Sequence, residues 1–195
     1  MPKKDLIIVG ANLDIIEFAE RLKYNVIGVI DNEHIGDYYG YEVLGKDPEA
    51  ENILNKYPNA RLAIIPDSPK VRFKLFQIYS KITNKFESLI SNNSIISKYS
   101  SIGIGTLVHE KVTIMPNVTI GDFVRLNRNT HVGNDVHISN YCTVAPETII
   151  GGYSYSNDGD VTGNHGESDY WIVKMAGKEE PVTNATKHLH FVNNE

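Results

Sequence analysis

Aliphatic residues return every six positions through the second half of the chain. The column contains Ile90, Ile96, Ile102, Val108, Ile114, Ile120, Leu126, Val132, Ile138, Val144 and Ile150. A second column, four places further on in each hexad, contains only small or β-branched residues and one cysteine: Ser94, Ser100, Thr106, Val112, Val118, Val124, Thr130, Val136, Cys142, Thr148 and Ser154. This period matches neither a helix nor an ordinary two-faced strand. It predicts a parallel β-helix of hexapeptide repeats, in which each face of a three-sided prism points one large and one small side chain inward.

The first 85 residues follow another pattern, in which short apolar runs alternate with segments of helical spacing. The apolar runs end at Val9, Ile30 and Ile65, and each is typical of a buried strand. Helices are expected at 13–23, at 47–57 and from Pro69 onward, the last with Ser68 as its N-cap. Strands that alternate with helices predict an α/β unit with a parallel sheet and right-handed crossovers.

The ends of these strands predict a ligand site, because ligands of such sheets bind at the carboxyl ends of the strands. The loops that follow the strands should bring six residues around one crevice: Gly10, Ala11, Asn12, Asp31, Asn32 and Asp67. The alternative is that these are only turn and cap residues, and we prefer that alternative for the neighbouring Ser68.

Composition limits the classes of partner. The net charge of −5 argues against nucleic acid or an anionic membrane as the main partner. The lone Cys142 lies in the small inward column, which favours a packed thiol over a catalytic one. The apolar run ending at Val9 is too short for a signal peptide and no later run could span a bilayer, so a cytoplasmic location is expected. No metal is expected, because 156–166 lacks the full carboxylate pattern of a calcium loop.

Polar side chains crowd the outward positions between Asn127 and Pro146. The candidates for proton transfer among them are His131, Asn134, Asp135 and His137. The hexads put the two histidines one face apart on the same coil, with Asn134 near the edge between them. A solvent-facing prism also carries such side chains without any function, and for each histidine alone that interpretation is the better one. Only the cluster as a whole suggests a site.

Several segments between residue 5 and about residue 152 match one known combination of domains. They are Ile8-Val9-Gly10-Ala11, Val26-Ile27-Gly28-Val29-Ile30-Asp31, Glu42-Val43-Leu44-Gly45, Ile64-Ile65-Pro66-Asp67 with Arg72, Leu89-Ile90 with Ile95-Ile96-Ser97, Ile120-Gly121-Asp122-Phe123-Val124, Val144-Ala145-Pro146 and Gly151-Gly152. In this combination the chain resembles the left-handed β-helix sugar acyltransferases, a family that includes bacillosamine N-acetyltransferase and sialic acid O-acetyltransferase.

The resemblance implies three parts. A Rossmann-like domain over residues 1–85 would hold a nucleotide-sugar, and a left-handed β-helix over residues 86–154 would bind the co-substrate acetyl-CoA. Residues 155–195 would be an atypical cap or tail, in which Tyr170–Val173 is expected as a strand. A homotrimer is also expected, because one chain cannot cover all the flat faces of so short a prism.

The resemblance also assigns roles to single residues. The family's general-base histidine and its acidic partner align with Asn134 and Asp135, and a second histidine that contacts the acetyl group aligns with Thr143. Gly152 aligns with the glycine whose backbone N–H meets the acetyl carbonyl. Asparagine cannot take up a proton at neutral pH, so the base is left open among Asp135, His131 and His137 as proton relays.

The expected function is therefore acetyl-CoA-dependent N-acetylation of a nucleotide-linked amino sugar, such as a 4-amino-4,6-dideoxyhexose. A missing base favours an amine acceptor, because a neutral amine is already nucleophilic whereas a hydroxyl must lose its proton during attack. The alternative is a catalytically inactive trimeric scaffold or sugar-nucleotide-binding protein, which the replacements at Asn134 and Thr143 favour. O-acylation of a sugar hydroxyl is the third hypothesis.

Overall fold

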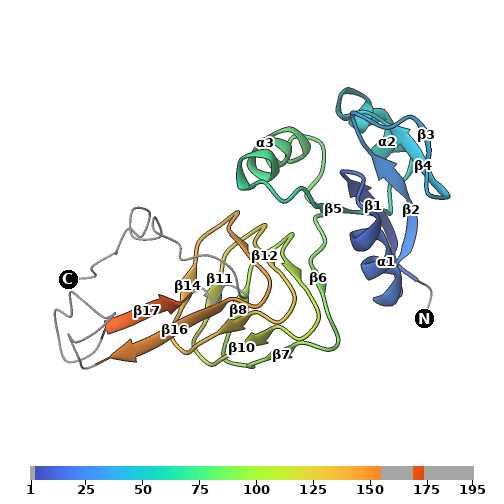
Figure 1. Ribbon diagram of the computed structural model, residues 1–195. Helices are drawn as coiled ribbons and strands as arrows, with labels where there is room; N and C mark the ends of the chain where they lie inside the picture. Colours follow the sequence, from blue (N-terminus) through green and yellow to red (C-terminus); the bar gives the residue numbers. More distant parts are fainter. Residues whose placement is uncertain (1–2, 155–168, 174–195) are drawn as a thin grey trace, which may run out of the picture.

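The computed structural model describes residues 3–154 and 169–173, which form a small α/β unit and a column of very short strands (Figure 1). The rest of the expected cap or tail at 155–195 lies outside the described residues. The α/β unit contains one five-stranded sheet in the order β3-β4-β2-β1-β5. Its strands are β1 (Asp5–Val9), β2 (Asn25–Ile30), β3 (Gly36–Tyr38), β4 (Tyr41–Gly45) and β5 (Arg61–Ile64). Its helices are α1 (Leu13–Arg21), a 3-10 turn η1 (Asp47–Glu49) that leads into α2 (Ala50–Lys56), and α3 (Pro69–Tyr79).

The central strand β1 is apolar along its length because both of its faces are covered. Leu6 and Ile8 pack in one hydrophobic cluster with α1, and Ile7 and Val9 pack in another with α2 and α3. All four side chains are at most 1% exposed. Burial of an aliphatic side chain of this size stabilises the fold by about 1.5–3 kcal/mol. The continuous apolar run therefore reflects a doubly covered parallel strand.

Two details of the α/β unit differ from the sequence-based expectation. The parallel sheet is extended at one edge by β3, which pairs antiparallel with β4 through a tight turn at Tyr39-Gly40. This hairpin was not predicted, because its strands are short and none of their residues is fully buried. Ser68 does occupy the N-cap position of α3, but its side chain forms no capping hydrogen bond.

The column consists of strands that repeat every six residues and pair in parallel with the strand 18 residues later, as His131 pairs with Thr113. Three ladders result. The strands are β6 (Leu89–Ile90), β9 (Leu107–Val108), β12 (Arg125–Leu126) and β15 (Thr143–Val144) in the first ladder; β7 (Ile95–Ile96), β10 (Thr113–Ile114), β13 (His131–Val132) and β16 (Ile149–Ser154) in the second; and β8 (Ser101–Ile102), β11 (Thr119–Ile120) and β14 (His137–Ile138) in the third. The second ladder ends with β17 (Asp169–Val173), antiparallel to β16, so a strand does cover the expected Tyr170–Val173.

The aliphatic column of the sequence fills the interior of these ladders. Val108, Ile114, Leu126 and Val132 are at most 1% exposed and belong to one cluster. The small column lies beside it, with Thr106 and Thr130 fully buried and Cys142 partly buried against the same cluster. Burial raises the pKa of the Cys142 thiol, as is typical of a packed cysteine.

The first ladder carries the contact between the column and the α/β unit. Its outward residues follow one another as Leu89, Leu107, Arg125 and Thr143. The two leucines pack in the α1-side cluster of the sheet, whereas Arg125 and Thr143 bond to the loop after β5. The outward face thus changes from apolar to polar where it reaches the ends of the sheet strands.

Candidate functional site

A cavity of about 520 Å³ lies at the carboxyl ends of β1, β2 and β5, which is the usual size and place of a ligand pocket in an α/β fold. Its walls come from the three loops that follow these strands, from Asp47 after β4, from one face of α3 and from the column. All six residues expected at the crevice line it: Gly10, Ala11, Asn12, Asp31, Asn32 and Asp67. The structure thus brings these residues together, while their role in binding stays a prediction.

Asp31 joins two of the loops around the cavity. Its carboxylate accepts hydrogen bonds from the backbone N–H groups of Ala11, Glu33 and His34 at 2.8–2.9 Å, and Oδ1 lies 2.8 Å from the His34 ring. Burial alone would raise the pKa of Asp31, but the His34 ring and these N–H groups together hold that pKa below its ordinary value. The carboxylate therefore stays ionised and organises the loops.

Two predicted asparagines also have structural partners. Asn12 Oδ1 accepts the Ile15 N–H at 3.2 Å and so caps α1, as the turn-and-cap alternative supposed. Asn32 donates to the Asp47 carboxylate at 2.6 Å and accepts the Asp47 N–H at 3.1 Å. The fully buried Tyr79 donates its hydroxyl proton to the same carboxylate at 2.7 Å. This network fixes the cavity wall formed by the loops after β2 and β4.

Arg125 is a cavity residue that the sequence-based reasoning missed. Its Nη1 lies 3.0 Å from Asp67 Oδ1 and donates to the Ile65 carbonyl at 3.2 Å. The Arg125 side chain is 9% exposed, whereas the Asp67 side chain is 71% exposed. Its position in the hexads could have predicted this placement, because Arg125 continues the outward series of Leu89 and Leu107 on the face that meets the sheet.

Arg72 fixes the loop that carries Asp67. It is 2% exposed and donates six hydrogen bonds, to the carbonyls of Pro66, Asp67, Phe123, Tyr141 and Cys142 and to the Thr143 hydroxyl. Burial, with the charge of Arg125 nearby, lowers the pKa of Arg72 to about 10. The guanidinium therefore remains charged at neutral pH and connects α3 to the column.

Thr143, expected near the acetyl group, is engaged in the same contact. Its hydroxyl accepts from Arg72 Nη2 at 2.9 Å and donates to the Asp67 carbonyl at 2.7 Å. Thr143 is absent from the described lining of the cavity. The expected contact with acetyl-CoA stays a prediction, and within this chain the hydroxyl holds two units together.

The residues expected to transfer protons lie on other walls of the column. His131 belongs to the second ladder and His137 to the third, with Asn134 and Asp135 in the turn between them. The Asp135 carboxylate accepts a hydrogen bond from Asn117 Nδ2 at 3.0 Å. The described cavity lining includes none of these four residues. A single copy of the chain therefore does not bring the cluster to the cavity.

Gly152, the expected donor to the acetyl carbonyl, lies in the irregular part of β16. The pairing of β16 with β17 shifts register between Ile150 and Tyr153, so Gly152 falls inside this bulge. Strand β16 also stacks on β13 and continues the ladder of His131. The backbone thus places Gly152 on the same wall as one of the candidate proton relays.

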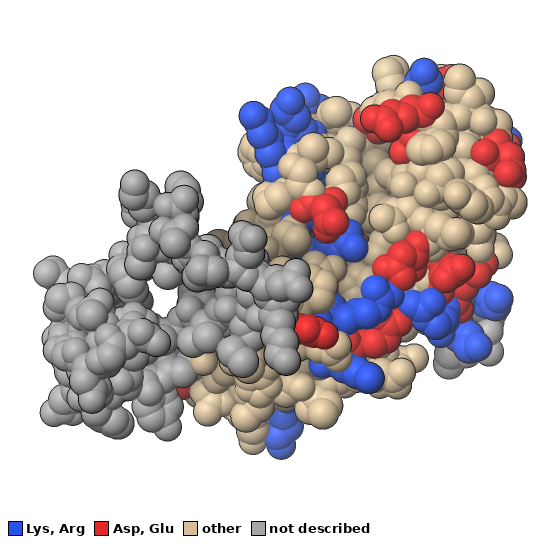
Figure 2. Space-filling model, in the orientation of Figure 1, with Lys and Arg blue, Asp and Glu red and all other residues tan. Residues whose placement is uncertain are grey.

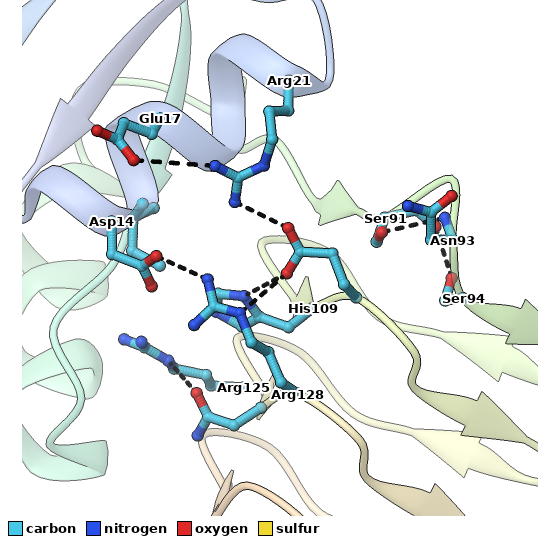
Figure 3. Close-up of polar contacts among 12 residues, drawn as sticks. Asp14, Glu17, Arg21, Ser91, Asn93, Ser94, His109, Arg125 and Arg128 are labelled. Atoms are coloured by element: carbon cyan, nitrogen blue, oxygen red, sulfur yellow. Dashed lines mark hydrogen bonds and ion pairs between the residues drawn. The ribbon is translucent and has the colours of Figure 1, made fainter.

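A cluster of charged residues joins α1 to the column (Figure 3). Arg128 bonds to Asp14 at 2.6 Å and to Glu110 at 3.2 Å, and Arg21 bonds to Glu110 at 2.8 Å. Figure 2 shows the resulting band of mixed charge where the two units meet. The residues of this cluster are far apart in the sequence, so no local sequence motif predicted the cluster.

His109 lies buried within this cluster. Its ring stacks on Phe18 with centroids 4.8 Å apart and is fully inaccessible to solvent. Neither ring nitrogen has a hydrogen-bond partner among the described residues, and the dashed contact in Figure 3 joins Nδ1 to Glu110 Oε2 at 3.6 Å, which is too long for a hydrogen bond. Burial, with the charges of Arg125 and Arg128, lowers the pKa of His109. The ring is therefore neutral at physiological pH.

Residues 3–154 and 169–173 contain neither a metal-binding cluster nor a membrane-spanning helix. No cluster of three or more His, Cys, Asp or Glu side chains there has the geometry of a metal site. No helix in the same residues is long and apolar enough to cross a membrane.

Comparison with known proteins gives a consistent family of similar proteins, although no family model matches the chain. The chain is 33% identical over 72 residues to GDP-perosamine N-acetyltransferase of Escherichia coli O157:H7. The match covers 37% of this chain and 33% of that protein, so the chain spans about a third of the length of this relative.

Solved structures show the same fold over most of the chain. The acetyltransferase domain of PglB from Neisseria gonorrhoeae FA1090 has a TM-score of 0.67 at 22% identity, covering 74% of this chain and 72% of that one. A histidine-to-asparagine variant of perosamine N-acetyltransferase from Caulobacter crescentus, in complex with CoA and GDP-perosamine, has a TM-score of 0.68 at 22% identity, covering 73% and 69%. WeeI from Acinetobacter baumannii AYE has a TM-score of 0.61 at 23% identity, covering 73% and 70%. The resemblance to sugar acetyltransferases is thus confirmed.

Proposed function

We propose that the chain is an acetyl-CoA-dependent N-acetyltransferase that acts on a nucleotide-linked amino sugar, such as a 4-amino-4,6-dideoxyhexose. The main support for this proposal is the cavity at the strand ends of the α/β sheet, which sits against a column of hexad strands. The fold is also similar to that of such enzymes. PerB from Caulobacter crescentus holds CoA and GDP-perosamine, and the PglB domain holds acetyl coenzyme A. By this likeness, the nucleotide-sugar would occupy the cavity and acetyl-CoA would bind along the column.

The reaction forms one bond and breaks another. The sugar amine attacks the thioester carbonyl carbon, the new C–N bond forms, and the C–S bond breaks as CoA leaves. The amine loses one proton and the CoA thiolate gains one, so a relay group between them completes the transfer. The Gly152 N–H, in the bulge of β16, would donate to the carbonyl oxygen as negative charge develops there.

The placement of the proton-transfer residues supports an assembly of several copies. Asn134 and Asp135 lie on a corner of the column that does not line the cavity of the same chain. We infer a homotrimer of left-handed β-helices, in which this corner of one copy meets the cavity of the next. The domain limits 1–85 and 86–154 belong to the same proposal, because the change from sheet to column falls between them.

The absence of a histidine at position 134 is compatible with slow catalysis. A general base contributes about 10²- to 10⁴-fold to the rate. Holding the two reactants together can contribute roughly 7–11 kcal/mol to lowering the barrier. In the Caulobacter crescentus protein, a histidine-to-asparagine variant still holds CoA and GDP-perosamine. We therefore expect binding of both substrates here, and a turnover limited by proton transfer.

Release of free CoA thiol tests the proposal directly. The full chain is incubated with acetyl-CoA and a panel of nucleotide-linked amino sugars that includes GDP-perosamine. Thiol release that depends on one of these sugars, with the acetylated sugar identified by mass, is the expected result. No transfer to any amino sugar from an intact assembly that binds both ligands would contradict it.

A second candidate is a catalytically inactive sugar-nucleotide-binding protein. Two observations favour it: Asn134 cannot take up a proton, and the Thr143 hydroxyl is engaged with Arg72 and Asp67. Thermal-shift titrations separate the two candidates. Stabilisation by both acetyl-CoA and nucleotide-sugars supports the enzyme, whereas stabilisation by nucleotide-sugars alone supports the binding protein.

A further inference from the structure

Helix α3 turns one mixed apolar and basic face toward the cavity. Val71, Lys74, Leu75 and Ile78 recur at helical spacing, and all four line the cavity. Val71 and Ile78 are 41% and 42% exposed, so apolar surface lies open along the helix on both sides of Lys74. Apolar surface inside a cavity is surface that a bound ligand covers.

The charges around the cavity are divided between its two sides. The strand order puts the ends of β2 and β4 on one side of β1, and the end of β5 with α3 on the other. The first side carries the carboxylates of Asp31, Glu33 and Asp47. The second side carries the two cations that line the cavity, Lys74 and Arg125, and one carboxylate, Asp67, which pairs with Arg125. A ligand that is anionic at one end only would fit this division.

Most of these charges already have partners. Asp31 accepts backbone N–H groups, Asp47 accepts the Tyr79 hydroxyl and the Asn32 amide, and Arg125 pairs with Asp67. Lys74 is exposed, and it takes part in no ion pair or side-chain hydrogen bond within the described range 3–154. It is therefore the cation at the cavity that remains available to a ligand.

We propose that Lys74 binds the diphosphate of the nucleotide-sugar, with Val71 and Ile78 against the adjoining apolar part of the nucleotide. The assignment rests on the proposed function, because it names the group that receives the charged part of the same substrate. Lysine binds phosphate oxygens as a mobile point charge, and its aliphatic stem extends the apolar surface of α3. The hydroxyl and N–H donors of the nucleoside then face the carboxylates on the β2 side. Lys74 thus sets both the affinity for the diphosphate and the direction in which the substrate lies.

Calorimetric titration of the full chain with GDP, guanosine, UDP and uridine tests this assignment. Lys74→Met keeps an aliphatic side chain and removes the charge. It is expected to weaken binding of the nucleoside diphosphate that the chain accepts by about tenfold or more, the usual cost of losing a hydrogen bond to a charged group. The affinity of Lys74→Met for the matching nucleoside is expected to stay within about twofold of that of the original chain, because a nucleoside carries no phosphate for Lys74 to bind.

Two further variants make the result specific. Lys74→Arg keeps the charge and is expected to restore most of the affinity for the diphosphate. Lys70→Met makes the same charge change at an exposed position one helical turn earlier on α3, outside the cavity lining, and is expected to leave binding within about twofold. The assignment is overturned if Lys74→Met leaves diphosphate binding intact, or weakens nucleoside and diphosphate equally.

The outcomes for this assignment and for the proposed function can be told apart. If the chain binds the diphosphate through Lys74 but releases no thiol with any amino sugar, the acetyl-transfer proposal fails and the phosphate-binding role stands. If thiol is released while Lys74→Met binds and reacts as the original chain does, the reverse holds. If no nucleoside diphosphate binds, both proposals fail.

Discussion

At the scale of single residues, His109 makes stability depend on pH. The folded chain holds the ring neutral, because burial and the charges of Arg125 and Arg128 lower its pKa. The carboxylates of Asp14 and Glu110, which face the ring from α1 and from the column, act in the opposite direction and do not overcome this shift. The unfolded chain takes up a proton near the ordinary histidine pKa of about 6.5.

The free energy of unfolding is therefore expected to fall as the pH drops below about 6.5, with a slope of up to about 1.4 kcal/mol per pH unit from this one proton. The loss continues until the pH reaches the lowered pKa of the folded state. Urea denaturation between pH 7.5 and 5.5 measures the slope. His109→Leu should remove this part of the slope, and an unchanged slope would show that another group causes it.

Gly105 combines a left-handed backbone conformation with a close aromatic neighbour at a corner of the column. Its φ is +65°, and a Cβ added there would lie 2.4 Å from the ring of Phe123. Gly105→Ala is therefore expected to destabilise the chain by about 1–3 kcal/mol, because overpacking adds to the strain of the left-handed backbone. Gly36→Ala is a matched control, since Gly36 has φ +79° and no atom within 4 Å of the added Cβ. Equal losses in denaturant titrations would mean that the clash with Phe123 has no effect.

At the scale of elements, Arg72 connects α3 to the column. Around it, Phe76 of α3 packs against Phe123 at 4.9 Å between ring centroids, and Phe73 packs against Tyr141 at 5.3 Å. Arg72→Met leaves several buried carbonyls without a donor and is expected to cost about 3–5 kcal/mol.

The ion pair of Arg21 and Glu110, whose arginine is exposed, provides the control for the stability effect of Arg72→Met. Arg21→Met removes an ion pair in which the arginine is 48% exposed, and such pairs contribute about 0–1 kcal/mol. Thermal unfolding of both variants measures the difference. A similar small effect from both would mean that α3 is held to the column by the aromatic contacts alone.

The sequence predicted the elements well where one repeating pattern determined them. The aliphatic hexads correspond to two-residue strands, and the run at Leu6–Val9 corresponds to the doubly covered β1. The β3–β4 hairpin was missed, because its short, half-exposed strands depend on pairing with the edge of β2 and not on their own pattern.

The site was predictable to a smaller extent. The six crevice residues followed from the rule that loops after parallel strands converge. Arg125 and Lys74 did not, because their position at the cavity depends on how the column and α3 dock on the sheet. The partners of Asp31 and Asn32 were also hidden, since a sequence does not tell a free carboxylate from one already holding a loop.

At the scale of the whole molecule, the separation of the cavity from the Asp135 corner predicts a site shared between copies. Two variants should each abolish thiol release: Val71→Trp, which fills the cavity, and the triple variant His131→Ala, Asp135→Asn, His137→Ala. If the copies of the proposed trimer share sites, an equal mixture of the two variants should recover about a quarter of the original activity, because a quarter of neighbouring pairs then combine an intact cavity with an intact corner. Gel filtration confirms mixing. No recovery in mixed trimers would place each site within one chain.

The hexad ladders have a geometric consequence for how such a chain can change length. Duplicating residues 109–126 after Leu126 would keep every ladder in register, and it would lift the later corner, with Asn134 and Asp135, by one strand spacing of about 4.8 Å. An insertion of only six residues would instead rotate that corner onto the next wall. Insertions and deletions in this half of the molecule therefore act in discrete steps. Only a change by a whole turn of the column, 18 residues, keeps each reactive group on its original wall.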